Sequence, residues 1–394
     1  MRISAVIGKN FGDEGKGLVT ASLSLSYKKP LIIKTNGGAQ AGHTVENPEK
    51  GTRFIHHQTG SGSEYGATTL WSETYHPDLY KLEEEVEGLK SAFGRLPVIF
   101  AEPNTEITTI DDILINMAIE NKRGEARHGS CGMGIHECCK RGAAGFGLPI
   151  ADVFRLSESE LFDRLKANRK DYSYRRIDDL KLALDGEHLS LFSDNNVLAN
   201  YASAIKANTC YIKLTEAGTS FLNCYDGLIF ENGQGLLLDE ENEKFYPHVT
   251  ASRTGLTEPM HFLKKRGLEL DEVLYITRPY VTRHGAGLLP CECDRGELLG
   301  VGIDKTNQTN EWQGSIRYGK HESFNAFFEP IIEDLQLAAI DLKPSLVLTH
   351  MNETNGKIYF DGHTLELVEF LRACAANFEH IYISDNHSDI KQAC

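Results

Sequence analysis

The segment GDEGKG at residues 12–17 contains residue types that bind and transfer phosphate. It follows the apolar run ISAVIG at residues 3–8 and precedes a helix-compatible run, which is the strand, turn and helix order of phosphate loops. In such a turn, glycine N–H groups, a helix N-terminus and a lysine all point at an anion. We therefore predict a phosphate-binding turn with the ligands Gly12, Gly15, Lys16 and Gly17.

The spacing of this turn differs from that of an ordinary P-loop, G-x-x-x-x-G-K-[ST]. Asn10 stands where the first glycine belongs, and Gly17 stands where serine or threonine belongs. The turn also contains two acids, Asp13 and Glu14. A carboxylate beside bound phosphates lowers affinity unless it holds a metal ion or takes a proton from a nucleophile. The alternative is a tight strand-to-helix turn whose charges are merely solvated.

His43 is a second candidate for chemistry. It lies in NGGAQAGHT at residues 36–44, where small neighbours leave the imidazole open to a ligand. Beside a phosphate loop such a histidine can act as an acid or stabilise a transition state, whereas a single histidine is more often structural. The longer segment 36–75 is rich in Gly, Ser, Thr, Asn and His, as mobile insertions and ligand-approaching loops are.

The apolar runs of the chain indicate the scaffold that positions these residues. Nearly continuous β-rich runs suit a sheet that is covered on both faces. Helix-compatible segments with capping residues lie between several of them. The expected strands are 3–8, 30–35, 96–101, 226–230, 272–277, 345–350 and 380–384. The expected helices are 111–122, 157–173 and 324–340.

This alternation of strands and helices predicts an α/β fold around a mainly parallel central sheet, similar to that of P-loop NTPases. No repeat or low-complexity linker divides the chain, so we expect one large domain over residues 1–394 with long functional loops. Further polar, loop-like segments are 128–137, 231–239, 282–290 and 306–319.

The charge of the chain limits its partners. A formal net charge of −15 at pH 7 opposes sequence-independent attraction to nucleic acid or to an anionic membrane. No run reaches the roughly 18 apolar residues of a membrane-spanning helix, and the N-terminus lacks the apolar core of a secretory signal. We therefore expect no nucleic-acid or membrane partner and a cytoplasmic location.

The cysteines give no strong signal for a metal site or a disulfide framework. There are nine, an odd number scattered along the chain. HECCK at 136–140 and CEC at 291–293 lack the paired spacing of a zinc site. We expect mostly reduced thiols with packing or surface roles.

Six segments, in the same order, resemble the hallmark motifs of the adenylosuccinate synthetases. GDEGKG resembles the family's GDEGKGK, and NGGAQAGHT, about 25 residues later, resembles a GG-x-NAGHT-like segment. The others are HGSCGMGIHE (like GTTGRGIGP), ENGQGLLLDEENEKFYPHVTAS (like EGAQGTLLD…GTYPFVTSS), TRHGAGLLPCE (like TRVGAGPFPTE) and LVLTHMN (like LALTKLD). Together they cover nearly the whole chain.

The resemblance implies a two-step ligation that forms adenylosuccinate on the route to AMP. Asp13 would take the N1 proton of IMP, and O6 would attack the γ-phosphate of GTP, giving 6-phosphoryl-IMP. His43 and Lys16 would stabilise the transferring group, and the amine of L-aspartate would then displace phosphate. By the same resemblance, Mg²⁺ would be bound by Asp13 and the carbonyl of Gly42.

The resemblance also assigns the binding residues. An arginine that a neighbouring subunit supplies in the family would correspond to Arg141 with slipped spacing, which implies a homodimer. The implied nucleotide-binding residues are Gly12, Gly15, Lys16, Gly17, Gly42, Thr44, Asn352 and Ser384. The implied purine monophosphate ligands are Asn36, Ser130, Cys131, Arg141, Gln234 and Thr250.

The segment that binds aspartate departs from the family pattern. The family has a threonine- and arginine-rich loop ending in TTGRRR, whereas the nearest match here is EWQGSIRYG. Because a carboxylate substrate favours a guanidinium fork, we expect Ser315 and Arg317 to bind aspartate, with Arg283 as a weaker candidate.

The guanine-reading motif is altered as well. Asn352 replaces the family's Asp, and an amide offers one acceptor and one donor, which suits the edge of adenine. ATP or dATP therefore rivals GTP as the donor. The reduced arginine loop resembles phage enzymes that make 2-aminoadenylosuccinate from dGMP, although those replace the catalytic Asp that is retained here as Asp13. IMP is the leading acceptor and dGMP the alternative.

Two other classes of protein were weighed. A kinase or GTPase would share the phosphate loop but would not need the His43 segment or HGAG at 284–287. A non-catalytic nucleotide-binding homologue would explain the altered loops, but it would not be expected to retain Asp13, Lys16 and His43 together.

Overall fold

The computed structural model describes most of the chain, namely residues 1–47, 51–124, 132–184, 186–298, 300, 314–385 and 389–393. Its centre is a ten-stranded sheet within these residues. Every neighbouring pair is parallel except the last pair at one edge, β16 and β17. From edge to edge the strands are β17 (Lys391–Gln392), β16 (Ile381–Ile383), β13 (Ser345–Leu348), β9 (Glu272–Thr277), β1 (Arg2–Gly8), β8 (Gly227–Gly235), β2 (Pro30–Lys34), β5 (Thr68–Trp71), β6 (Val98–Ala101) and β7 (Ile212–Leu214).

The predicted α/β fold with a mainly parallel sheet is confirmed, and all seven predicted strands belong to this sheet. The largest shift is in β8, which continues past the predicted end at residue 230 to Gly235. Three strands were missed: β5, β7 and β17. Two are only two or three residues long, and β5 lies inside the polar segment 36–75, so no apolar run marks them.

The sheet is buried because alternate strand residues pack into clusters on its two faces. In β1, Ile3, Ala5 and Ile7 belong to a cluster with residues of α11 (Thr257–Lys264), α12 (Phe324–Leu337) and α13 (Leu367–Cys374). Val6 instead packs with Val19 of α1 (Lys16–Ser24). Helices therefore cover both faces, which explains the continuous apolar strands.

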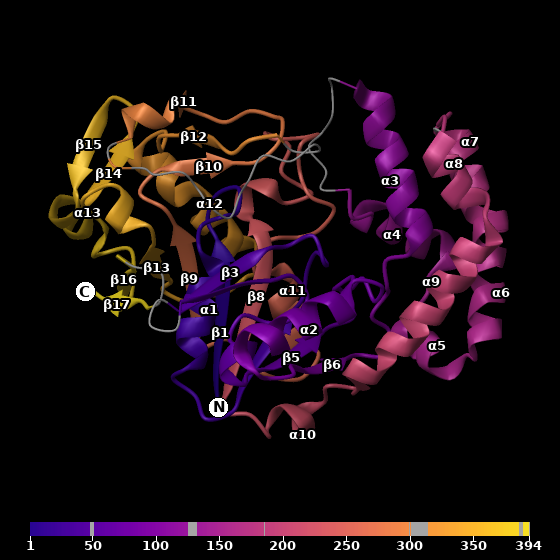
Figure 1. Cartoon of the computed structure of the whole chain (residues 1–394). Helices are drawn as coiled ribbons and strands as arrows, with labels where there is room; N and C mark the ends of the chain where they lie inside the picture. Colours follow the sequence, from indigo (N-terminus) through magenta and orange to yellow (C-terminus); the bar gives the residue numbers. More distant parts are fainter. Residues whose placement is uncertain are drawn as a thin grey trace.

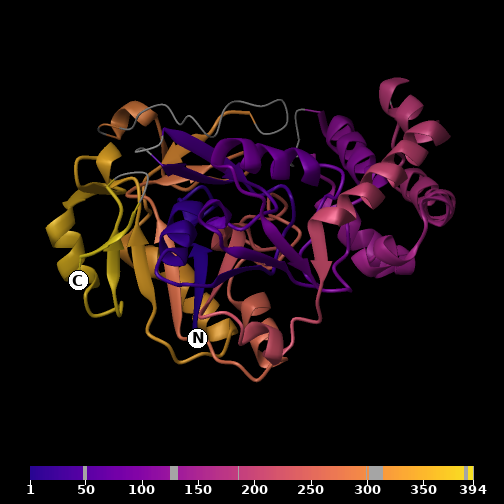
Figure 2. The same ribbon diagram turned by 60° about the horizontal axis from the view of Figure 1, so that its bottom comes forward.

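A group of helices lies at the β7 edge, and the C-terminal elements lie at the opposite end (Figures 1 and 2). The predicted helices at 111–122 and 324–340 are confirmed as α3 and α12, whereas the one at 157–173 is α6 followed by a π-helical turn at Arg169–Ser173. The helix group comprises α3 (Ile110–Arg123), α4 (Ile135–Arg141), α5 (Ile150–Arg155), α6 (Glu158–Asn168), α7 (Tyr174–Asp179), α8 (Gly186–Ser193) and α9 (Asn195–Ala207). The remaining helices are α2 (Leu82–Phe93) and α10 (Thr219–Leu222).

Smaller antiparallel sheets hold the loops. The polar segment 36–75 contains a hairpin in which His43 pairs with His56. The hairpins and small sheet are β3 (His43–Asn47) with β4 (Thr52–His56), β10 (Val281–Arg283) with β12 (Arg317–Gly319) and β11 (Glu292–Cys293), and β14 (Lys357–Phe360) with β15 (His363–Glu366).

The carboxyl ends of the parallel strands gather the predicted site residues at one edge of the sheet, as ligand sites of open α/β sheets are gathered. The phosphate loop follows β1, Asn36 follows β2, and Gln234 lies near the end of β8. Asn352 and Ser384 follow β13 and β16. The strand order therefore places the phosphate loop between the predicted base-reading residues and the predicted purine monophosphate residues.

Three further findings concern classes of site. No helix in the described part of the chain is long and apolar enough to cross a membrane. The described cysteines are free thiols, as expected. The described residues contain no cluster of three or more His, Cys, Asp or Glu side chains suited to a metal ion.

Candidate functional site

The phosphate loop is folded around the buried carboxylate of Glu14. Its Oε1 accepts hydrogen bonds from the backbone N–H groups of Asn10 (2.9 Å) and Gly12 (3.0 Å), and Oε2 lies 3.3 Å from Lys16 Nζ. Thr349, at the end of β13, donates through its hydroxyl to the Glu14 carbonyl at 2.6 Å. Of the two acids in the turn, Glu14 therefore has a structural role and holds the loop in shape.

Glycines permit this loop where a side chain would not fit. Gly15 caps α1 in a left-handed conformation (φ 89°) against the Thr349 side chain. A Cβ on Gly17 would lie 3.0 Å from His43 Cβ and 2.9 Å from the Thr44 carbonyl oxygen. This close approach brings the His43 hairpin against the first turn of α1, so the structure brings together two motifs that were predicted to act together.

Asp13 points away from this network. Its backbone is left-handed (φ 59°), its carbonyl accepts from Arg278 Nε at 2.6 Å, and its side chain is 26% exposed. The nearest ionisable group is His284, whose Nε2 lies 3.7 Å from Asp13 Oδ2. No lysine or arginine of the described residues pairs with the carboxylate, so it is open to a substrate proton or a metal ion.

His43 lies in a buried charged cluster. Its Nδ1 is 2.9 Å from Glu231 Oε1, while Lys34 Nζ is 3.2 Å from Glu231 Oε2. Burial lowers the pKa of His43 to about 4, against the opposing effect of Glu231 and with help from Lys34 and Lys16. Burial raises the pKa of Glu231, but Lys34 and His43 outweigh it and hold that pKa well below the usual value. The free protein thus presents a neutral imidazole whose ring is oriented by an ionised carboxylate.

On the purine monophosphate side, Asn36 and Gln234 differ. The Asn36 amide is used within the chain, because Nδ2 donates to the Gly233 carbonyl (3.2 Å) and Oδ1 accepts from Gly233 N–H (2.8 Å). Gln234 has a left-handed backbone (φ 58°), and its buried Oε1 has no hydrogen-bond partner among the described residues. Gln234 is therefore available to a ligand, whereas Asn36 shapes the loop that carries it.

At the other end, the predicted base-reading residues lie on loops of paired strands. Asn352 is exposed, and Ser384 is buried, with its N–H donating to the Leu348 carbonyl (2.8 Å) and its carbonyl accepting from Met351 N–H (3.2 Å). The loop after β13 also touches Gly15 through Thr349. An exposed Asn352 beside the phosphate loop fits a residue that contacts a nucleotide base.

Arg141 does not fit its predicted role. It is 1% exposed, and its Nε and Nη2 donate to Asp112 at 3.0 to 3.2 Å. The remaining donors reach the carbonyls of Phe146 and Ile107. Because its guanidinium is satisfied inside its own chain, the structure favours a structural role for Arg141 over contact with a phosphate in a neighbouring subunit.

The two arginines predicted for aspartate differ in their partners. Arg317 pairs with Glu292 and donates to the carbonyls of Gly285 and Gly287, so it holds the HGAG loop. Arg283 is 1% exposed and has no acidic partner among the described residues. Its Nη1 and Nη2 donate to the carbonyls of Leu288 (2.6 Å) and His248 (2.7 Å), while its Nε has no hydrogen bond. Burial, followed by the nearby Arg317, lowers the pKa of Arg283 to about 10. Of the two arginines, Arg283 is therefore the one without an acidic partner. Ser315 is exposed and lies just before β12 in the chain.

Several other predicted residues have simple placements. Ser130 and Cys131 lie outside the described residues. Gly42 is exposed at the start of the His43 hairpin. Thr250 is partly exposed, and its N–H donates to the Leu238 carbonyl at 2.8 Å, which leaves its side chain as the group for a ligand.

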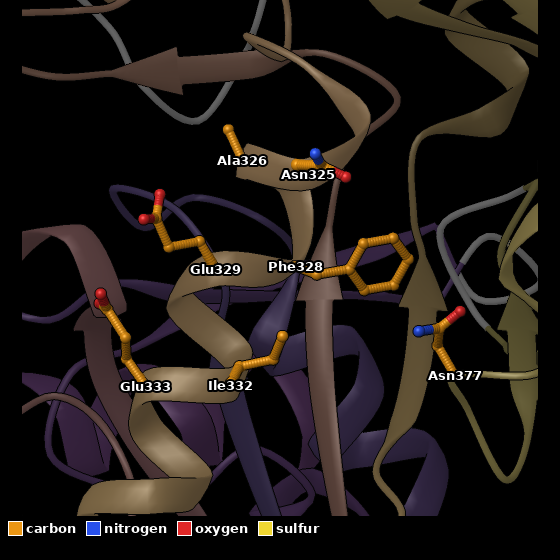
Figure 3. Close-up of a pocket in the computed structure, with 7 residues that line it drawn as sticks. All are labelled: Asn325, Ala326, Phe328, Glu329, Ile332, Glu333 and Asn377. Carbon is orange, nitrogen blue, oxygen red and sulfur yellow. The ribbon is translucent and has the colours of Figure 1, made fainter.

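A surface groove of about 430 Å³ elsewhere on the molecule contains none of these residues (Figure 3). It lies along α12, and Figure 3 shows the carboxylates of Glu329 and Glu333 on one side and Phe328 and Asn377 on the other. An acidic, open groove of this kind does not suit a phosphorylated ligand.

Sequence reasoning missed three residues. Glu231 and Lys34 are charged residues next to or inside apolar strands, and a charge in a buried strand is a signal for a paired network. His284 replaces the valine of the family-like TRVGAG motif, and its buried Nδ1 has no hydrogen-bond partner in the described structure. No local sequence pattern indicates that His284 lies opposite Asp13.

Comparisons with known proteins give matches over most of the chain. A family model described as adenylosuccinate synthetase matches residues 5–315. The chain is 29% identical over 296 residues to the adenylosuccinate synthetase of Thermoplasma volcanium, covering 74% of this chain and 64% of that protein. It is 28% identical over 314 residues to that of Aspergillus flavus, covering 77% and 68%.

Solved structures share the fold. Fully ligated adenylosuccinate synthetase from Plasmodium falciparum matches with a TM-score of 0.66 at 19% identity, over 91% of this chain and 79% of that one. The cyanophage S-2L succinoaminodeoxyadenylate synthetase, bound to dGMP and to dATP as an energy donor, matches with a TM-score of 0.60 at 15% identity, over 99% and 95%. The family model spans most of the chain, and the chain belongs to the adenylosuccinate synthetase family.

Proposed function

We propose that this protein is a ligase that joins the amino group of L-aspartate to C6 of a purine monophosphate. The observation that carries the proposal is the division of roles inside GDEGKG. Glu14 is consumed in folding the loop, whereas the Asp13 carboxylate stays partly exposed and unpaired with lysine or arginine in the described structure. A reactive carboxylate beside a phosphate loop suits proton removal at the site of phosphoryl transfer.

In the first step, Asp13 takes the N1 proton of the purine and O6 attacks the γ-phosphorus of the triphosphate. The O6–P bond forms as the bond to the leaving nucleoside diphosphate breaks. Lys16 and the Gly15 and Gly17 amides hold the phosphates, whereas the Gly12 N–H is bound to Glu14. His43, oriented by Glu231, faces the transferring group. In the second step, the aspartate nitrogen attacks C6, and phosphate leaves with the oxygen that was O6.

A divalent metal ion, Mg²⁺, is part of the proposal. The Asp13 carboxylate and the exposed Gly42 backbone fit it, since oxygen donors free of cationic partners are what a hard cation requires. When bound, it would supply neutralisation of charge on the phosphate oxygens.

For the substrates, Gln234 and Thr250 contact the purine monophosphate, together with Ser130 and Cys131 by resemblance. Arg283 is the principal partner of the aspartate carboxylate, because substrate binding would give this buried cation its missing anion. Ser315 supplies a hydroxyl, and Arg317 acts indirectly by holding the HGAG loop.

The nucleotides on either side of the reaction are the finer part of the proposal. IMP is the leading acceptor, and ATP or dATP competes with GTP as donor because Asn352 is exposed where the family has Asp. The dGMP alternative has a specific point in its favour, since one protein of this fold was solved with dGMP and dATP. We also propose a cytoplasmic homodimer, without the interface role for Arg141.

The test is phosphate release by purified protein incubated with Mg²⁺, L-aspartate and each pairing of IMP or dGMP with GTP, ATP or dATP. The proposal expects release that requires all three substrates and one clearly preferred pairing. Absence of aspartate-dependent release with every pairing would rule out the ligase and favour a non-catalytic binding protein.

A further inference from the structure

A cysteine and a histidine form a close pair at the interface between α4 and the sheet. Cys139 Sγ lies 3.3 Å from His76 Nε2. The other ring nitrogen of His76, Nδ1, lies 3.3 Å from the Glu106 carbonyl oxygen. Both side chains are partly exposed. Nothing in the proposed ligase reaction uses either residue.

The partners of His76 fix the direction of proton transfer. A carbonyl oxygen only accepts, so the nitrogen facing Glu106 carries the ring proton in the neutral tautomer. The lone pair of Nε2 then faces the thiol of Cys139. The nucleophile Cys139 thus contacts the base His76, and His76 contacts the Glu106 carbonyl, which orients its ring. Activated thiols have this arrangement.

The contacts around the pair raise the pKa of His76. Burial lowers the pKa of His76, but its hydrogen bond and electrostatic contact with Cys139 and its contacts with Glu106 outweigh burial, so the pKa is raised overall. The neighbouring Cys138 is the opposite case. It is buried, its Sγ lies 3.7 Å from His76 Nδ1, its thiol donates to the Ile107 carbonyl, and burial raises its pKa far above the usual value.

The pair lies against residues predicted to bind the purine monophosphate. Cys139 Sγ is 3.9 Å from the carbonyl oxygen of Ala251, the neighbour of Thr250. The backbone N–H of His76 donates to the Gly37 carbonyl at 2.9 Å. A Cβ on Gly37 would lie 3.4 Å from Gln234 Oε1, so His76 is one residue away from the Gln234 side chain. Added bulk at Sγ would lie against the loops that carry Thr250 and Gln234.

We propose that Cys139, activated by His76, is a modification site for hydroperoxides, and that its oxidation weakens binding of the purine monophosphate. His76 Nε2 takes the thiol proton, and the thiolate sulfur attacks one peroxide oxygen. The S–O bond forms as the O–O bond breaks, and the leaving oxygen takes the proton from the imidazolium. The sulfur is oxidised by two electrons to sulfenic acid, and the hydroperoxide is reduced to water or an alcohol. The binding effect rests on the proposed function, whereas the reactivity of the thiol does not.

The first experiment measures thiol reactivity on the full chain, free of nucleotide. Iodoacetamide at pH 7 is applied to the native protein and to the variants H76N and C138S, and the alkylated cysteines are identified by peptide mass spectrometry. We expect Cys139 to react at least about tenfold faster than the exposed Cys210 and Cys224, because only a thiolate reacts. H76N should remove the advantage, and C138S should keep it.

Equal rates for Cys139 and the two exposed thiols in the native protein would overturn the proposal without any variant. The pH dependence of the Cys139 rate is a second readout that does not depend on how H76N folds. An inflection below the usual thiol pKa of about 8.5 supports activation, and an inflection at that value contradicts it.

The second experiment measures binding of IMP and dGMP by calorimetry before and after treatment with hydrogen peroxide. We expect an affinity loss of about tenfold or more that dithiothreitol reverses and that C139S resists, with C138S as the matched control. Unchanged affinity of a protein shown to be oxidised at Cys139 overturns the coupling. Failure of the reduced protein to bind either nucleotide contradicts the proposed function, while the alkylation rates still decide whether the thiol is activated.

Discussion

In the proposed site, the buried charges at the triphosphate end are paired with one another, whereas a buried arginine at the amino-acid end has no acidic partner in the described structure. At the triphosphate end, Glu14 contacts Lys16, and Glu231 contacts both Lys34 and His43, so charges are held before any ligand arrives. At the amino-acid end, Arg283 is buried without an acidic partner in the described structure. The comparison teaches that internal pairs preorganise one end, whereas under the proposed function the substrate would supply the missing anion at the other.

The largest expected effect is at Asp13. Asp13→Asn keeps the size of the side chain but removes the base, so we expect kcat to fall by about 10²- to 10⁴-fold with little change in the melting temperature. Steady-state rates of aspartate-dependent phosphate release measure the loss. Retention of more than a tenth of the activity in a folded variant would contradict the role of Asp13 as base.

Glu231→Gln tests the preorganised end. It leaves Lys34 and His43 buried without their carboxylate, so we expect a loss of about 3 to 5 kcal/mol in the free energy of unfolding, measured with urea. The matched control is Glu292→Gln, which breaks the more exposed pair with Arg317 and should cost under about 1 kcal/mol. Similar losses in the free energy of unfolding for the two variants would contradict the claim that the internal pairs of Glu231 preorganise this end of the site.

Arg283→Met tests the amino-acid end. We expect the KM for aspartate to rise by about 10- to 100-fold, since a charged hydrogen bond is worth roughly 1.5 to 3 kcal/mol. The free energy of unfolding should change little, because removal of a buried cation without an acidic partner offsets the loss of its hydrogen bonds to the Leu288 and His248 carbonyls. Arg317→Gln is the paired variant and should change the KM by a few fold only. A larger effect at Arg317 than at Arg283 would restore the ranking expected from the sequence.

The smallest effect is expected at Asn352. Asn352→Asp restores the family residue on an exposed loop and should move the ratio of kcat/KM for GTP over ATP toward GTP by about tenfold. Asn355→Asp is the matched control, since it adds the same charge to an exposed residue nearby. A ratio that shifts equally in both variants would show a general charge effect instead of base reading.

The central sheet could be predicted from the sequence because its longer strands are continuous apolar runs. The strand β5 was missed because it begins with two threonines, Thr68 and the buried Thr69, that a sequence reader assigns to a loop. The phosphate loop and the His43 segment were also predictable, since the functional residues of each motif lie close together in the sequence. The close packing of the two motifs at Gly17 depends on the folded structure, so the sequence alone did not predict it.

The rest of the site depends on contacts between distant residues. Glu231 meets His43 only after β8 pairs beside β2, and no local pattern joins them. Arg141 was given a ligand role from its position near a motif, although Asp112 binds it internally. Arg317 and Arg283 carry the same side chain, and only their partners distinguish them.

The most direct test of the account follows the oxygen at C6. IMP and dGMP labelled with ¹⁸O at O6 are each incubated with the protein, Mg²⁺, L-aspartate and the preferred triphosphate, and the released phosphate is examined by mass spectrometry. The account predicts one ¹⁸O atom in each phosphate, because O6 bonds to the γ-phosphorus and leaves with it. Release of unlabelled phosphate would show transfer to water instead and would contradict ligation through a 6-phosphoryl purine.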